Sequence, residues 1–358
     1  MTLVDAELEQ DKNDKIASVA SRGAALAAEL GQDPDQVEIF LQHYYRHVDA
    51  VDVDSRTVED LLGLVASHYR SALQRSPGEP VITVRTPRQG DDGWTAGGAT
   101  VVQVVTDDRP FLVDSVTMEV LRQGWSVREV FHPQYLVRRD DKGALVGVER
   151  NEGAAQPGVL PESWMHLEIL PPSRSDDAEG PVPALERGLR EVLELVRAAV
   201  EDWRPMLERS AETAELLADP ARTGDRTEEA TLARELIGWL NANHFTFLGY
   251  REYTLADNGD QARYAVVPGT GLGILRGDDD DPDAFHALPQ PGTRHLLMII
   301  TKDNARSRVH RPAFLDYLGL RTFDADGRVT GERRFLGLFA SSAYSESIAR
   351  VPVLRQKA

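Results

Sequence analysis

The first part of the chain carries hydrophobic residues at the spacing of amphipathic helices. An alanine-rich run over residues 16–30 ends at Gly31, and glycine commonly ends a helix because it tolerates a left-handed backbone. In the segments 37–48 and 57–73 the apolar residues recur at intervals of three and four, on one helical face. The run 76–80 contains two prolines and a glycine and breaks the pattern. We therefore expect a small helical segment that packs on the domain after it.

The middle of the chain, residues 81–204, mixes strands and helices. Apolar residues at helical spacing from Leu112 to Leu121 predict a helix that ends at Gly124. A linker at 171–183 precedes a long amphipathic helix. This order predicts an α+β sandwich with helices on one face of an antiparallel sheet. The expected strands are 81–85, 99–105, 125–138 with a break at His132–Pro133, 144–148 and 164–170.

The C-terminal part also predicts helices followed by strands. Residues 205–242 are expected to form two connecting helices, the second starting near Thr227 as its cap. A second α+β domain is the simplest interpretation of the residues from 243 onward. Residues 344–358 resemble the entrance of another helix, and we expect the chain to be a fragment of a longer protein. The expected strands are 244–250, 264–267, 296–301 and 333–339.

Composition and charge narrow the possible functions. The chain has 358 residues, a net charge of −18 and no cysteine. An acidic surface repels nucleic acids and anionic membranes, and the lack of cysteine excludes disulfides, thiolate catalysis and thiolate metal sites. The sequence starts without the basic and apolar regions of a signal peptide, and no apolar run is long enough to span a bilayer. We expect a cytoplasmic protein that binds neither nucleic acid nor membrane.

Well-known catalytic motifs are missing from the sequence. It contains no nucleophile elbow, zinc-protease motif, P-loop or EF-hand spacing. His43 and His47 have the spacing of zinc ligands on a helix, but no third ligand accompanies them. The glycine loop 269–273 predicts a tight turn, because Ile274 stands where a dinucleotide fingerprint needs glycine. The aspartates of 278–283 predict a solvated loop. We expect no catalytic residue, metal or cofactor in this chain.

Cationic and polar side chains gather between residues 302 and 311. Such a cluster can hold a carboxylate or a phosphate, or it can pair with the acidic loop 278–283. The sequence favours the second, structural interpretation. The candidate residues of this polar patch are Lys302, Asn304, Arg306, Ser307, His310 and Arg311.

A second candidate site is the loop between the strand at 99–105 and the helix after it. Pro110 suits the first turn of that helix, and the N–H groups at a helix start can bind an anion. The alternative is a capped helix with a local pair between an aspartate and Arg109. The candidate effector-binding residues are Asp107, Asp108, Arg109, Phe111, Asp114 and Ser115.

The same loop carries a family resemblance. Residues 106–115, followed by 121–124, resemble the signature of the ACT domain, in which a strand leads through Asp-Arg-Pro-Gly to a helix ending at glycine. Phe111 stands at the position of the signature glycine. Over residues 36–358 the chain also resembles the N-terminal region of the large bacterial NAD-specific glutamate dehydrogenases. The segments that carry this second resemblance are 130–133, 244–252, 301–312, 333–339 and 344–354.

The resemblance implies an α+β regulatory portion with an N-terminal helical segment, an ACT-like (ferredoxin-like) sandwich and a PAS-like domain with an antiparallel sheet. It implies that the whole enzyme deaminates L-glutamate oxidatively to 2-oxoglutarate and ammonia with NAD, and that the catalytic domain lies outside this chain. It further implies a homo-oligomer formed through ACT-like domains, with an amino acid as candidate effector. The expected boundaries are 1–79 for the helical segment, 80–205 for the ACT-like domain, 206–242 for the connecting helices, 243–343 for the PAS-like domain and 344–358 for the start of the next element.

Two departures from the ACT pattern keep an alternative open. Phe111 in place of glycine favours a purely structural assembly scaffold that binds no ligand. The ACT order βαββαβ is also altered, because a strand at 81–85 comes first and none clearly follows the helix at 184–203. The hypothesis is that the early strand fills the missing position in the sheet.

Overall fold

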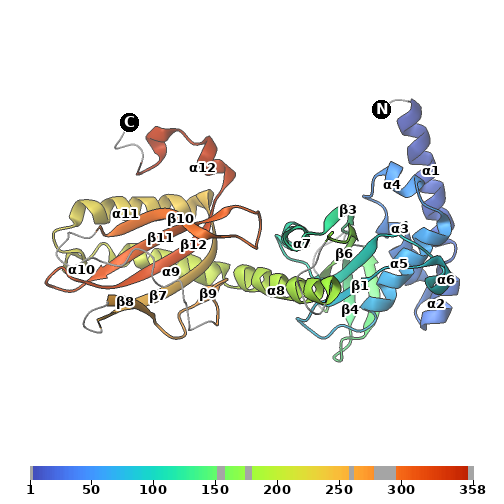
Figure 1. Ribbon diagram of the computed structural model, residues 1–358, viewed down its shortest axis with the longest axis horizontal. Helices are drawn as coiled ribbons and strands as arrows, with labels where there is room; N and C mark the ends of the chain where they lie inside the picture. The colour runs from blue at the N-terminus through green and yellow to red at the C-terminus, as the bar shows by residue number, and fades with distance from the viewer. Residues whose placement is uncertain (1–2, 151–157, 174–179, 258–261, 278–295, 354–358) are drawn as a thin grey trace. The chain divides into compact units, whose positions relative to one another are not determined.

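The computed structural model describes residues 3–150, 158–173, 180–257, 262–277 and 296–353 (Figure 1). The chain divides into two compact units, Met1–Leu193 and Glu194–Ala358, and each is treated by itself. Among the described residues, no helix is both long and apolar enough to cross a membrane.

The first unit opens with a helical segment. The alanine-rich run expected to form one helix forms two, because the chain turns at Ser21 and Arg22. The turn lets α2 pack on α3, where a Cβ at Gly23 would lie only 3.4 Å from the Cα of Glu38. The helices are α1 (Leu3–Ala20), α2 (Gly23–Leu30), α3 (Pro34–Tyr44), α4 (Ala50–Asp54) and α5 (Val58–Ala72).

The apolar faces expected in α3 and α5 are buried. Side-chain oxygens of Asp33 and Thr57 cap the starts of α3 and α5 and accept hydrogen bonds from backbone N–H groups of the first turn. Phe40 of α3 meets Tyr69 of α5 edge to face, with ring centroids 4.8 Å apart. Hydrophobic spacing therefore identified both helices and the face that each buries.

The sheet of the first unit is antiparallel and runs in the order β1-β2-β6-β4-β5. Strands β3 and β4 pair with successive parts of β6, so they form one line that is broken at His132–Pro133, as predicted. The early strand β1 pairs with β2 on the side away from β6, which confirms that it fills a sheet position. The strands are β1 (Val81–Arg85), β2 (Thr100–Asp107), β3 (Ser126–Phe131), β4 (Gln134–Arg139), β5 (Leu145–Arg150) and β6 (Leu160–Leu170).

Helices cover both faces of this sheet (Figure 1). α7 (Leu112–Arg122) and α8 (Pro181–Glu201) lie on one face, and the helical segment lies on the other. Alternate residues of β2 point to the helical segment: Val101 and Val105 join its core, and Gln103 donates to the carbonyl of Leu64 in α5. The short helix α6 (Gln89–Asp92) lies in the β1–β2 connection. The helical segment thus packs on the sheet, as expected.

The second unit places helices on one face of another antiparallel sheet. α9 (Trp203–Leu216), α10 (Pro220–Thr223) and α11 (Thr227–Trp239) precede a kinked turn over Leu240–His244, in which Asn243 has φ 65°. α11 begins at Thr227 with Arg226 in the cap position, so the expectation that Thr227 caps this helix was wrong. Leu236 and Ile237 of α11 pack on Phe247 and Phe335 of the sheet.

The second sheet runs in the order β10-β11-β12-β7-β8, with β9 beside β7. Strand β11 was not predicted from the sequence, because Asp316, Gly319 and Arg321 interrupt its apolar pattern. Asp316 is nevertheless buried and pairs with Lys302 on β10. The strands are β7 (Phe245–Asp257), β8 (Ala262–Val266), β9 (Leu272–Gly273), β10 (Met298–Arg306), β11 (Phe314–Phe323) and β12 (Val329–Phe339).

The C-terminal segment differs from its prediction. A short helix, α12 (Ser341–Ser345), begins before Tyr344 and ends where Glu346 becomes extended. A single 3₁₀ turn follows at Ile348–Arg350. The expectation that a helix enters at Tyr344 was therefore wrong for the described residues of this segment, and 354–358 lie outside them.

Candidate functional site

The β2–α7 loop of the first unit holds the candidate effector residues. Pro110 lies in the turn and α7 begins at Leu112, so the expectation that Pro110 occupies the first helical turn was wrong. Phe111 takes the N-cap position with φ 73°, in the left-handed region. Glycine adopts this region without strain, whereas other residues are strained in it. Phe111 therefore has the backbone conformation that suits the signature glycine.

The polar residues at the start of this loop have partners within the protein. Nη2 of Arg75 lies 2.6 Å from Oδ1 of Asp107, whose other oxygen lies 3.4 Å from Nη2 of Arg109. Oδ1 of Asp108 accepts hydrogen bonds from Oγ of Ser163 at 2.5 Å and from Nε2 of Gln134 at 2.9 Å. The loop therefore contains the local Asp–Arg pair that was the alternative to ligand binding.

The remaining candidates of this loop point in different directions. Asp114 is exposed in the first turn of α7, where a carboxylate is favoured by the helix dipole. Ser115 is fully buried, and its N–H donates to the carbonyl of Phe111. Asp107, Asp108 and Arg109 thus lie together, whereas the Ser115 side chain belongs to the interior.

A buried ion-pair cluster beneath the loop was not found from the sequence. Arg75 and Glu162 are almost completely buried, and Nη2 of Arg75 lies 2.7 Å from Oε1 of Glu162. Nε of Arg139 lies at the same distance from that oxygen. Because Arg75 also holds Asp107, this cluster ties the end of α5 to the β2–α7 loop. Its members are too far apart in sequence for any motif to reveal them.

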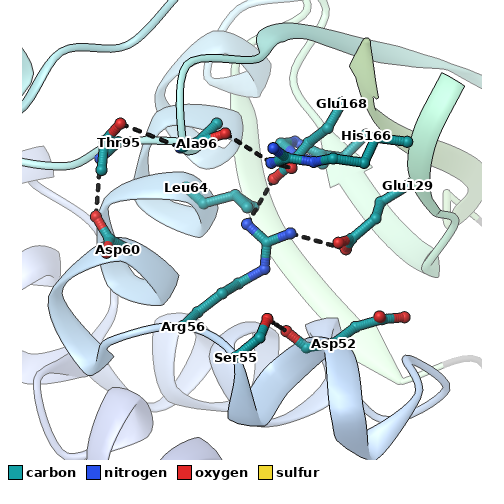
Figure 2. Close-up of polar contacts among 12 residues, drawn as sticks. Asp52, Ser55, Arg56, Asp60, Leu64, Thr95, Ala96, Glu129, His166 and Glu168 are labelled. Carbon is teal, nitrogen blue, oxygen red and sulfur yellow. Dashed lines mark hydrogen bonds and ion pairs between the residues drawn. The ribbon is translucent and has the colours of Figure 1, made fainter. Parts of the chain in front are cut away.

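A second network joins the helical segment to the sheet (Figure 2). Nη1 of Arg56 lies 2.6 Å from Oε1 of Glu168, and Nη2 lies 2.7 Å from Oε2 of Glu129. Arg128 also pairs with Glu168 and donates to the carbonyl of Ala96. Burial raises the pKa of Glu168, but its polar neighbours His166, 3.6 Å away, and Arg56, which donates a hydrogen bond, outweigh burial and lower the pKa to about 2. Glu168 therefore stays ionised at neutral pH.

Two histidines are buried near this network. Nδ1 of His68 lies 2.7 Å from the hydroxyl of Tyr44, and the ring of His166 stacks on Phe131 with centroids 5.3 Å apart. Burial lowers the pKa of His68 well below its ordinary value, and burial likewise lowers the pKa of His166. Both imidazoles are therefore neutral at neutral pH.

The described residues contain no cluster suited to a metal ion. The rings of His43 and His47 lie 6.3 Å apart between centroids, and His43 also contacts Tyr135. Among the residues that the structure describes, no group of three or more histidine, aspartate or glutamate side chains is arranged so that it could hold a metal ion.

The polar patch of 302–311 forms the end of the β10–β11 hairpin. Lys302 pairs with Asp316 at 2.6 Å, and the guanidinium of Arg306 lies 4.7 Å from the centroid of Phe314. In the turn, Oγ of Ser307 donates to the carbonyl of Val309. Arg311 donates to the carbonyl of Phe339, Asn304 is exposed, and His310 has φ 76°. The acidic loop 278–283, its expected partner, lies outside the described residues.

The glycine loop at 269–273 is a tight turn, as predicted. Gly269 and Gly273 both have positive φ, and Gly273 pairs with Gly249 of β7. No helix begins in the described residues directly after the loop, 274–277, which form a turn, so this part of the chain does not show the strand–loop–helix context of a dinucleotide site.

Comparisons with known proteins agree with this fold. The family described as glutamate dehydrogenase, ACT1 domain, matches residues 40–180. The NAD-specific glutamate dehydrogenase of Pseudomonas aeruginosa is 36% identical over 93% of this chain and 20% of its own length. That of Halomonas elongata is 34% identical over 90% of this chain, and that of Mycobacterium tuberculosis is 27% identical over 82%. This chain spans about a fifth of the length of the first two relatives. Residues 40–180 therefore match the ACT1 domain of glutamate dehydrogenases, and nearly the whole chain is similar to part of the NAD-specific glutamate dehydrogenases.

Proposed function

We propose that this chain is the non-catalytic N-terminal regulatory and assembly portion of an NAD-specific glutamate dehydrogenase. The whole enzyme would deaminate L-glutamate oxidatively to 2-oxoglutarate and ammonia with NAD. The supporting observation is coverage, because the match extends over 93% of this chain but only 20% of the Pseudomonas aeruginosa relative. The sequence also lacks a dinucleotide fingerprint. The proposal includes a PAS-like module in the second unit and a cytoplasmic location.

The absence of catalysis is tested with the purified chain. With L-glutamate and NAD we expect no increase in NADH absorbance above the rate without protein. Turnover that scales with the concentration of the chain would overturn the proposal. A whole glutamate dehydrogenase of this family serves as the positive control.

Regulation would act through the start of α7. We propose that an amino-acid effector places its carboxylate on the first N–H groups of this helix, with Arg109 and Asp108 completing the site. In support, no side chain caps the start of α7, and Arg109 lies at that end of the loop. Coupling to the active site would be reciprocal and worth about 1–3 kcal/mol.

The effector site is tested by calorimetric titration of Arg109→Ala with amino acids. We expect the affinity to fall at least about tenfold, the loss typical of one charge-assisted hydrogen bond. Arg138→Ala is the matched control, because Arg138 pairs with Glu149 at the surface of the same unit. Unchanged affinity in Arg109→Ala would contradict this location.

A specific observation favours the scaffold alternative. Asp107 and Asp108 already hold partners within the protein, and Phe111 occupies the glycine position. On this alternative no amino acid binds to the native loop. The variant Phe111→Gly would discriminate, because amino-acid binding gained on removing the ring would show that Phe111 blocks the site.

Self-association through the first sheet is a further part of the proposal. Within the described residues β5 is an edge strand, and its Val146 is 53% exposed. Exposed edge strands with apolar side chains are suited to pairing with another chain. We expect Val146→Lys to lower the mass measured by light scattering, whereas Val51→Lys on α4 leaves it unchanged. An equal mass in both variants would contradict this interface.

A further inference from the structure

The second unit contains a cavity that no part of the proposed function uses. Its volume is about 240 Å³, and all of its lining residues belong to the second unit. It adjoins the polar patch, since Arg306 and Arg308 both line it. At about 30 Å³ per water molecule it holds roughly eight waters, so a small metabolite fits.

One wall of the cavity is the segment after the glycine loop. Ile274 and Leu275 line the cavity, and the turn before them is fixed by Asp202 at the end of α8. Oδ2 of Asp202 accepts from the N–H of Gly273 at 2.8 Å and from Nε of Arg276 at 2.9 Å. Arg251 on β7 donates to the carbonyl of Leu275. This wall is therefore held by charge-assisted hydrogen bonds.

A second part of the lining is the end of the β10–β11 hairpin. The pairing register shifts between Lys302 and Arg306, so the strand bulges there. Oδ1 of Asp303 accepts from the N–H of Ala305 at 2.8 Å within this bulge. Such bulges redirect side chains, and here Asp303, Arg306 and Arg308 line the same cavity.

The floor of the cavity is formed by the face of the sheet opposite α11. Leu315 of β11 and Leu336 of β12 are buried there and supply apolar surface. Arg334 also lines the cavity, but its Nε lies 3.4 Å from Oε1 of Glu332, which offsets its charge. The cavity thus combines an apolar floor with the two guanidinium groups of Arg306 and Arg308 and one carboxylate.

We infer that this cavity binds a small carboxylate metabolite with an apolar body. The guanidinium groups of Arg306 and Arg308 suit a carboxylate, because guanidinium and carboxylate form paired hydrogen bonds. Ile274, Leu315 and Leu336 contact the apolar body. Asp303 can accept a hydrogen bond from an ammonium group. The ligand is therefore either an α-amino acid, whose ammonium group Asp303 binds, or a simple carboxylic acid. The site is independent of the proposed effector site, which lies in the first unit.

The inference is tested by calorimetric titration of the whole chain with 4-methylpentanoate, L-leucine, acetate and inorganic phosphate. We expect 4-methylpentanoate or L-leucine to bind more tightly than acetate and phosphate, because only these two probes fill the apolar floor. Tighter binding of L-leucine identifies an amino acid, and tighter binding of 4-methylpentanoate identifies a simple carboxylate. No binding of either probe at millimolar concentration would overturn the inference.

Variants assign the binding to this cavity. We expect Arg308→Gln to weaken binding at least about tenfold. Ala305→Phe keeps every charge and fills the cavity, and it should abolish binding. The matched control is Lys302→Gln, since Lys302 lies on the same strand and pairs with Asp316. Arg109→Ala, in the first unit, should leave this binding unchanged. Loss of binding in Arg109→Ala would assign the ligand to the effector site instead.

Discussion

At the scale of single residues, the backbone conformation of Phe111 shows why the ACT signature has a glycine at this position. The sequence places a phenylalanine at the glycine position of the ACT signature, and the structure gives that residue φ 73°. The position needs a left-handed backbone whether or not a ligand approaches it. Substitution of the glycine therefore carries a conformational cost as well as a steric effect on ligands.

This cost is measurable by comparing Phe111→Gly with Phe111→Ala. Both variants lose the ring, but only glycine relieves the left-handed strain. We expect Phe111→Gly to be more stable than Phe111→Ala by about 1 kcal/mol in urea unfolding. Equal stabilities would contradict the strained backbone at this residue.

The glycine loop permits a similar comparison. Gly269 and Gly273 have φ of 75° and 61°, but a Cβ at 273 would lie 2.1 Å from the carbonyl oxygen of Leu248, whereas a Cβ at 269 meets nothing within 4 Å. We expect Gly269→Ala to cost about 1 kcal/mol, from the positive φ alone. Gly273→Ala should cost clearly more, because the backbone must shift. Similar unfolding midpoints for the two variants would argue against this close approach.

At the scale of elements, the sequence predicted the helices and strands whose hydrophobic pattern lies within a single segment. Strand β1 and helix α5 follow directly from β-branched runs and helical spacing, and Thr57 caps α5. Strand β11 was missed because its buried Asp316 is explained only by Lys302 on another strand. The break between α1 and α2 was missed because packing on α3 decides it. Tertiary partners therefore account for both errors.

The helical segment is attached to the sheet by a buried ion-pair contact that no sequence motif reveals. Arg56, at the end of α4, is largely buried between Glu168 and Glu129 of the sheet. Removing one partner of a buried pair leaves uncompensated charge, so Arg56→Ala should cost about 3 kcal/mol or more in urea unfolding. Arg70→Ala removes the exposed pair with Glu29 and should cost less than about 1 kcal/mol. Equal effects would contradict a structural role for Arg56.

At the scale of the whole molecule, the sequence identified surface loops but not the sites they form. It singled out residues 107–115 and 302–311 from their local composition. It could not show that Arg75 holds Asp107, or that Ile274 and Arg308 line one cavity. These partners come from segments far apart in the chain, so only the folded arrangement brings them together. The polar residues of each loop were thus predictable from the sequence, whereas the distant residues that contact them were not.

The buried histidines make the stability of the fold depend on pH. Burial lowers the pKa of His68 and of His166 in the folded state, so below about pH 6.5 the unfolded chain takes up protons that the folded chain does not. Stability should therefore fall as pH falls from 7 to 5, by up to about 1.4 kcal/mol per pH unit for each imidazole. Protonation of Glu168, with a folded pKa of about 2, removes further stability at lower pH.

The contribution of His68 is isolated by repeating the measurement with His68→Gln. We expect the slope of the unfolding free energy against pH to become shallower between pH 7 and 5, even if the variant is less stable overall. A slope equal to that of the native chain would contradict a neutral, buried His68.

The most direct test of a regulatory role is a thermal unfolding screen of this chain against the twenty amino acids. An effector at a hundred times its dissociation constant stabilises the folded state by about 2.7 kcal/mol. The account predicts such a shift for one or a few amino acids, lost in Arg109→Ala and retained in Arg308→Gln. A screen in which no amino acid produces a shift that depends on Arg109 would contradict the sensor and leave the first unit as a scaffold.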